Sequence, residues 1–206
     1  LLDGETLSYD GVPFSLELAS GDIPVSVAAE GPRTLQMAGE IADGVVFGGG
    51  TKPSVVERGL EHIRSGAERA GRSLEDIHIS LLAPTCVADS QAEGVKRLLD
   101  VLEPIAYHNF SFSVEDAPTD LRVELRELVR QHDMREHGQT DAEPAREISP
   151  AVREYLGDRF AIAGPAERCR ERIEHLEARG VDECFLGFPP VNPIEHAERF
   201  AEQVMD

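Results

Sequence analysis

A short apolar stretch, a glycine-bearing turn and an amphipathic stretch recur in that order along most of the chain. The first unit joins a β-branched stretch at 23–29 to a helical pattern at 34–42. The second joins an apolar stretch at 44–47 to a helical pattern that stops at Gly71. Strands that are apolar throughout and alternate with helices pack as a parallel sheet covered by helices. The pattern therefore predicts an α/β fold.

Further units follow the same order toward the end of the chain. They comprise strands at 77–88, 160–163 and 181–187, a helix after Ser90, another after Gly164-Pro165, and a closing helix at 193–205. This makes four to five units, whereas a closed (β/α)8 barrel has eight. We expect one domain over 1–206 that forms a partial barrel, unless the sheet is open.

The region 108–149 breaks the repeat. It contains a predicted helix at 121–132 and a polar segment at 137–144. Long insertions of this kind often cover an active site. We expect a helical insertion that lies over one end of the barrel and acts as a lid.

The charge of the chain limits its partners. The formal net charge is −19, so we expect neither nucleic acid nor an anionic membrane surface to bind. Lys52 and Lys96 are the only lysines, and the other basic residues are arginine. An acidic surface with few lysines is consistent with adaptation to high salt, and a GC-rich genome is the alternative explanation. The chain also lacks an apolar run of about 18 residues, the length of a membrane span.

Neither the cysteines nor the histidines show a recognisable catalytic or metal-binding pattern. Cys86, Cys169 and Cys184 are odd in number and have no CxxC spacing, which favours a reduced, cytoplasmic protein. His132 and His137 are five residues apart and lack an HExxH context. We therefore predict no metal site and leave the catalytic residues unknown.

Two predicted strand ends carry the features of an anion-binding turn. In each, glycine and a basic residue stand between a strand and the start of a helix, where free N–H groups and the helix dipole attract phosphate. Carboxyl ends of neighbouring parallel strands share one rim. Glycine at a strand end also serves ordinary turns, and the triple glycine is neither a Walker loop nor a GxGxxG. The candidate binding residues are Ala28, Ala29, Gly31, Arg33, Gly48, Gly49, Gly50 and Thr51.

The order of these stretches resembles the luciferase-like monooxygenase superfamily. The most specific part runs from 23–33 through 38–46, with Ala-Ala-x-Gly-Pro and Ala-Asp-Gly. The stretches 160–167 and 178–183 resemble the family's last helix–strand unit, and 2–14 resembles the segment before its fifth strand. The closest similarity is to the branch of methylenetetrahydromethanopterin reductase and related coenzyme F420-dependent oxidoreductases. The resemblance covers nearly the whole chain as the C-terminal half of a TIM barrel.

The resemblance implies an enzyme that uses coenzyme F420 or FMN and transfers hydride between cofactor and a small organic substrate. It also implies that the residues at the two strand ends contact the cofactor phosphate and tail. The family's first four strands have no counterpart here, so we expect the isolated chain to have little activity. The alternatives are a non-catalytic half-barrel that binds a ligand or dimerises, and a phosphate-binding aldolase or epimerase. Free strand edges at both ends of a half-barrel favour a homo-oligomer.

Overall fold

The computed structural model describes residues 6–15, 23–132 and 148–205. The strands are β1 (Leu7–Tyr9), β2 (Val12–Phe14), β3 (Ser26–Ala29), β4 (Gly44–Phe47), β5 (His78–Val87), β6 (Ile162–Gly164) and β7 (Glu183–Gly187). The α-helices are α1 (Pro32–Ile41), α2 (Pro53–Arg69), α3 (Gln91–Arg97), α4 (Leu99–Phe110), α5 (Arg122–Gln131), α6 (Pro150–Phe160), α7 (Ala166–Glu177) and α8 (Pro193–Phe200). A 3-10 turn, η1 (Leu74–Asp76), precedes β5, and a π-helical turn, η2 (Ala201–Met205), follows α8.

The sheet is parallel, as the sequence predicts. Strand β4 lies between β3 and β5, and β7 pairs with β5. The register aligns Ala28 with Val46, Val46 with Ser80, and Ser80 with Glu183. The short β6 pairs only with the last residues of β5. The strand predicted at 160–163 therefore begins two residues later, because α6 continues to Phe160.

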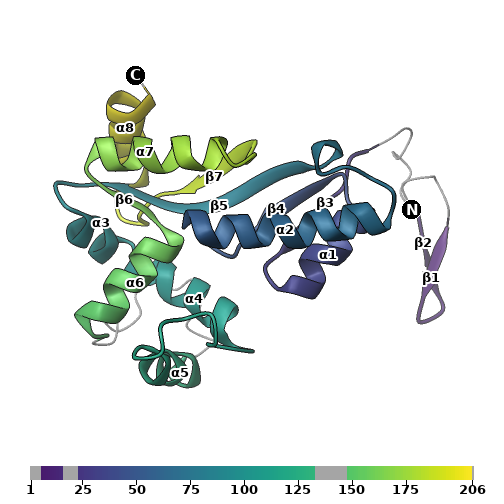
Figure 1. Cartoon of the computed structure of the whole chain (residues 1–206), viewed down its shortest axis with the longest axis horizontal. Helices are drawn as coiled ribbons and strands as arrows, with labels where there is room; N and C mark the ends of the chain where they lie inside the picture. Colours follow the sequence, from purple (N-terminus) through teal and green to yellow (C-terminus); the bar gives the residue numbers. More distant parts are fainter. Residues whose placement is uncertain (1–5, 16–22, 133–147, 206) are drawn as a thin grey trace.

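One face of the sheet is covered by helices, and α1, α2 and α7 lie along it (Figure 1). Side chains of β5 point alternately to the two faces of the sheet. Ile79, Leu81 and Ala83 point to the covered face and belong to the core cluster that joins the sheet to these helices. Residues of the other parity lie on the opposite face. Leu82 of β5 and Phe185 of β7 are each 45% exposed there. Within the described residues, the sheet has one packed face and one largely open face.

A second hydrophobic core joins α3, α4, α5 and α6. Its fully buried side chains include Leu102, Leu125, Leu156 and Phe160. The predicted helix at 121–132 is confirmed as α5, whereas α6 was not predicted. The polar segment 137–144 lies outside the described residues. The role of region 108–149 as a lid stays a prediction.

The first turns of α3 and α2 begin in different ways, one with a serine cap and one with a proline. Ser90 caps α3 as predicted, with its hydroxyl accepting a hydrogen bond from the N–H of Glu93 at 3.2 Å. Ser54 is not the cap of α2, although a serine often caps a helix: α2 begins at Pro53, and Lys52 is its N-cap. Proline suits the first helical position because its φ is already helical and no N–H is needed there.

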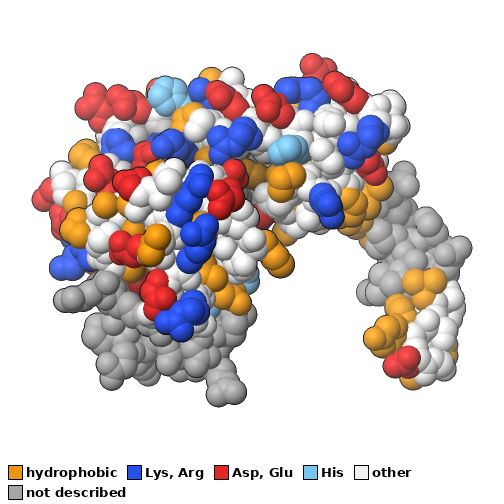
Figure 2. Space-filling model, turned by 60° about the horizontal axis from the view of Figure 1, so that its bottom comes forward, with side chains coloured by type: hydrophobic (Ala, Val, Ile, Leu, Met, Phe, Trp, Pro, Cys, Tyr) orange, Lys and Arg blue, Asp and Glu red, His pale blue; other side chains and the backbone are white. Residues whose placement is uncertain are grey.

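Strands β1 and β2 form an antiparallel hairpin beside the sheet (Figure 1). Its turn places Asp10 and Gly11 at positive φ, as a two-residue hairpin turn requires. Apolar side chains of the hairpin are exposed, and Figure 2 shows them set apart from the main body. None of the helices described in the structure combines the length and apolar character needed to cross a bilayer.

Candidate functional site

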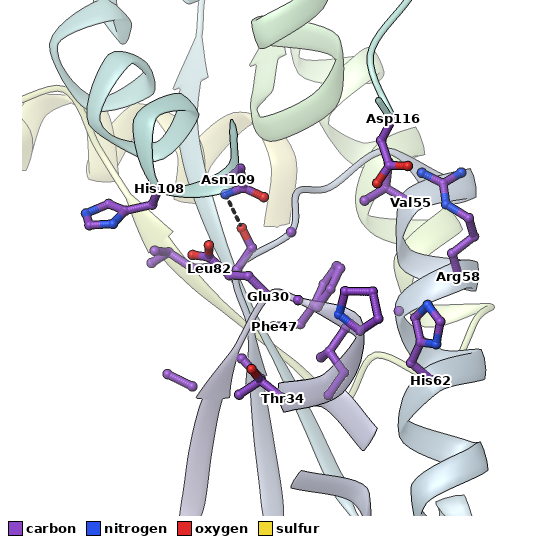
Figure 3. Close-up of a pocket in the computed structure, with 18 of the residues that line it drawn as sticks. Glu30, Thr34, Phe47, Val55, Arg58, His62, Leu82, His108, Asn109 and Asp116 are labelled. Carbon is purple, nitrogen blue, oxygen red and sulfur yellow. Dashed lines mark hydrogen bonds between the residues drawn. The ribbon is translucent and has the colours of Figure 1, made fainter. Parts of the chain in front are cut away.

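A cavity of about 630 Å³ opens at the carboxyl ends of β3 and β4. Helices α1 and α2 form one side of it, and α4 with the connection to α5 forms another (Figure 3). The two strand ends singled out from the sequence therefore share one rim. Five of the eight predicted binding residues line this cavity: Ala28, Ala29, Gly31, Gly48 and Gly49.

The turn between β3 and α1 supplies unpaired backbone donors. Gly31 is the N-cap of α1 and provides no side-chain cap, and Pro32 follows it. The first N–H that bonds back to the Gly31 carbonyl is that of Leu35, at 2.9 Å. The N–H groups of Arg33 and Thr34 precede it, in the turn whose donors lack intrahelical partners. A Cβ at Gly31 would meet nothing within 4 Å, so the space beside this turn is open.

The glycines after β4 are explained by packing. A Cβ on Gly48 would lie 2.6 Å from a carboxylate oxygen of Glu30, and one on Gly49 would lie 2.3 Å from the ring of Phe47. A Cβ on Gly50 would lie 2.4 Å from the backbone oxygen of Arg159. Gly50 also has φ +123, which favours glycine. The triple glycine thus lets Glu30, Phe47 and α6 pack closely, whether or not a ligand is bound.

Three of the predicted binding residues lie away from the cavity wall. Thr51 is fully buried, and its hydroxyl donates to the Ala161 carbonyl at 3.2 Å. Gly50 packs against α6, and Arg33 is exposed on α1 without lining the cavity. The Thr51 hydroxyl and the Arg33 guanidinium are therefore not among the groups that line this cavity.

The structure adds polar residues that the sequence analysis missed. Arg58 and His62 stand one turn apart on α2 and face the cavity (Figure 3). Asn109 of α4 donates from Nδ2 to the Gly48 carbonyl at 3.2 Å, which ties α4 to the end of β4. Thr34 of α1 lines the floor near the uncapped turn. The only available sequence signal was that Arg58 and His62 border the apolar stripe of α2.

Glu30 is the carboxylate closest to the β3–α1 turn. Its pKa is raised by burial, and His108 partly opposes this through its favourable charge interaction. Figure 3 shows Glu30 and His108 on the same side of the cavity, from β3 and α4. A carboxylate with a raised pKa can take up a proton more readily than an exposed glutamate.

The cysteines and lysines show no activated group. Burial raises the pKa of Cys169 to about 11, and it raises the pKa of Cys86 and Cys184 as well. These thiols are therefore protonated at neutral pH and are weak nucleophiles. Lys52 pairs with Asp158 at 2.8 Å, outside any strand. A Schiff-base lysine inside the sheet, as the aldolase alternative requires, is not found among the described residues.

Comparison with known proteins gives a consistent result. A family model described as luciferase-like monooxygenase matches residues 1–183. The chain is 30% identical over 208 residues to 5,10-methylenetetrahydromethanopterin reductase of Methanopyrus kandleri, covering 91% of this chain and 53% of the relative. It is 25% identical over 195 residues to the enzyme of the same name from Methanolobus tindarius, covering 91% and 54%. The chain thus spans about half the length of the curated relatives it matches.

A solved structure supports the fold. The coenzyme F420-dependent tetrahydromethanopterin reductase of Methanopyrus kandleri superposes with a TM-score of 0.66 at 22% identity, covering 99% of this chain and 58% of that one. The parallel sheet with its helices is therefore part of a TIM-barrel fold, as predicted. On the match over residues 1–183, this chain belongs to the luciferase-like monooxygenase family.

Proposed function

We propose that this chain supplies the part of a flavin- or deazaflavin-dependent oxidoreductase that holds the cofactor's phosphate and tail. The observation that carries the proposal is the uncapped start of α1, which opens into a cavity at the carboxyl ends of two parallel strands. In open and closed α/β sheets, this edge is where ligands bind. The whole enzyme would transfer hydride between FMN or coenzyme F420 and a small organic substrate.

Apart from the carboxylates of Glu30 and Asp116, the polar groups at the cavity fit an anionic cofactor tail. Backbone N–H groups at the start of α1 and the hydroxyl of Thr34 would donate hydrogen bonds to a phosphate group from one side. Arg58 and His62 would face it from α2. When bound, the cofactor supplies the redox chemistry, while these residues orient it and balance its charge.

Substitution at Gly31 tests this directly. Gly31 has φ −82 and open space for a Cβ, so other residues fit there. Aspartate is a favourable N-cap, and in place of glycine it would stabilise α1 by roughly a few tenths of a kcal/mol. Its carboxylate would occupy the anion position and repel phosphate. We expect Gly31→Asp to raise the melting temperature and to weaken FMN and F420 binding at least about tenfold, the effect of roughly 1.4 kcal/mol.

Gly31→Ala is the matched control, because it adds a Cβ without charge and should bind like the wild type. Affinities would be measured by titrating each protein and following cofactor fluorescence. If the wild type binds neither FMN nor F420, or if Gly31→Asp binds both as well as Gly31→Ala does, the cofactor assignment fails.

A non-catalytic half-barrel is the second candidate, favoured by the open face of the sheet and by the outer edges of β3 and β7, which no other described strand pairs with. The same titration, combined with light scattering after size exclusion, separates the two. A stable dimer that binds no cofactor would favour this second candidate.

We expect the chain of 206 residues to bind cofactor but to show little turnover. It spans about half of the relatives' length, and the described residues present no activated nucleophile at the cavity. Assays with reduced FMN and reduced F420 on the purified chain test this. Sustained substrate-dependent oxidation of either cofactor would contradict it.

A further inference from the structure

Arg159 of α6 carries a buried guanidinium group that none of the described carboxylates neutralises. The residue is only 7% exposed. Its Nη1 donates to the hydroxyl of Tyr155 at 3.0 Å, whereas its Nε has no acceptor. Among the residues that the structure describes, no carboxylate forms an ion pair with it. A buried charge without a counter-charge is costly, because the lost hydration is not replaced.

Several nearby cations are paired, whereas Arg153 on the same helix, like Arg159, has a buried Nε without an acceptor. Arg172 has a side chain only 12% exposed, and it bonds to Asp158 at 3.1 Å. Arg168 and Lys52 also pair with Asp158. Asp158 thus serves three cations of this region, while among the described residues neither Arg159 nor Arg153 has a carboxylate partner, and of these two only Arg159 lines the cavity.

The surroundings of Arg159 hold it in place without balancing its charge. The rings of Phe110 and Phe160 lie 5.1 and 5.3 Å from its guanidinium carbon. Such cation–π contacts orient a guanidinium but bring no negative charge. The Arg159 carbonyl accepts from the N–H groups of Thr51 and Lys52 at 2.8 and 3.0 Å. The backbone of α6 is therefore anchored to the β4–α2 loop, directly beside the proposed cofactor site.

Arg159 is also one of the residues that line the cavity at the ends of β3 and β4. We propose that Arg159 binds an anionic oxygen group, phosphate or carboxylate, on the ligand that occupies this cavity. A guanidinium recognises such groups through two parallel N–H donors. The inference rests on the proposed function, in that it assumes the cavity is the ligand site. The anionic group could belong to the cofactor or to the substrate.

The test compares wild type with Arg159→Met, Arg159→Lys and the control Arg153→Met. Arg153 lies on the same helix, is partly buried, and does not line this cavity. FMN and riboflavin differ only by the phosphate, so their affinities separate the cofactor phosphate from the ring. Inorganic phosphate is the third probe, followed by the shift it causes in melting temperature.

We expect Arg159→Met to weaken FMN binding by about 10- to 100-fold, the range for a hydrogen bond to a charged group, and to leave riboflavin affinity unchanged. Arg159→Lys should lie between wild type and Arg159→Met. If FMN affinity is unchanged but the phosphate-induced shift in melting temperature is lost, the anionic group belongs to the substrate. Without ligand, Arg159→Met should melt at the wild-type temperature or higher, because an unpaired buried charge has been removed.

The inference is overturned if Arg159→Met retains both wild-type FMN affinity and the wild-type response to phosphate. A lower melting temperature with an intact phosphate response would show that Arg159 only packs between the two rings. A wild type that binds neither FMN nor F420 would refute the proposed function. The phosphate arm would still decide the role of Arg159 in that case.

Discussion

Glu30 illustrates how a single residue in this site depends on its neighbours. Its carboxylate occupies the space that a side chain at position 48 would need, and burial raises its pKa. His108 opposes that shift through its charge. Ionised Glu30 therefore destabilises the folded state, because water is partly excluded from its carboxylate there.

This makes the stability of the chain depend on pH in a defined direction. Because the pKa of Glu30 is raised in the folded state, its contribution to the free energy of unfolding is favourable at low pH. That contribution is lost as the pH rises through the raised pKa. We expect Glu30→Gln to raise the melting temperature at about neutral pH, because the neutral amide does not carry the buried charge. The gain should disappear as the pH falls below 4.5, the ordinary pKa of glutamate.

Thermal melts of wild type and Glu30→Gln across this pH range measure the effect. Glu61→Gln, at an exposed position of α2, makes the same chemical change away from the cavity and is the matched control. An equal gain at low and neutral pH would rule out titration of Glu30 as the cause.

At the scale of elements, α1 and α2 touch through their backbones. A Cβ on Gly39 would lie 2.1 Å from the Ile63 carbonyl oxygen, and one on Gly66 would lie 1.9 Å from that of Gln36. This close crossing places the start of α1 beside the cavity-facing side of α2. The geometry of the proposed anion site therefore depends on two glycines far from it.

Gly66→Ala separates packing from helix propensity. Alanine is intrinsically better than glycine inside a helix by about 1 kcal/mol. The contact with Gln36 would force the helices apart, and such overpacking typically costs about 1–3 kcal/mol. We expect a net loss in the free energy of unfolding, measured by urea denaturation. The exposed Glu68→Ala on the same helix should change little, and a stabilised Gly66→Ala would show that the helices separate freely.

At the scale of the whole molecule, the open face of the sheet bears on self-association, and the surface charge bears on how stability depends on salt. Leu82 and Phe185 lie opposite each other in register on the face that the described helices leave uncovered. On the surface shown in Figure 2, acidic and basic side chains are intermingled, although the sequence as a whole carries −19. An exposed apolar face and unpaired strand edges promote association.

We expect the purified chain to associate with itself as its concentration rises. A lysine at Phe185 should weaken this, because a charge on the open face opposes burial of that face. Light scattering after size exclusion measures the mass of wild type and Phe185→Lys. Val123→Lys, at an exposed apolar residue on α5, is the control. Monomeric wild type at all concentrations would contradict the expectation.

The acidic composition gives a second prediction at this scale. Repulsion among an excess of carboxylates is screened by salt. We expect the melting temperature to rise from low to molar KCl, as it would for a surface adapted to high salt. A melting temperature that does not change with KCl would favour genome composition as the reason for the scarcity of lysine.

Part of the candidate site was predictable, because it depends on the order of elements. The two strand ends had to share a rim once the sheet was parallel, and Gly31 and Gly48 do line one cavity. The roles of the other glycines were not predictable. At position 50 the Arg159 carbonyl leaves no room for a Cβ. That contact comes from α6, a helix that the sequence pattern did not reveal.

The sequence by itself determined the parallel α/β arrangement of strands and helices, because strand and helix periodicities are local. Only the tertiary structure decided which charges meet at the cavity. Asn109 reaches Gly48 across 61 positions, and Thr51 reaches Ala161 across 110. Contacts over such separations depend on how the second helical core packs against the strand ends. No local pattern encodes that packing, and so Arg58, Asn109 and Arg159 became apparent only in three dimensions.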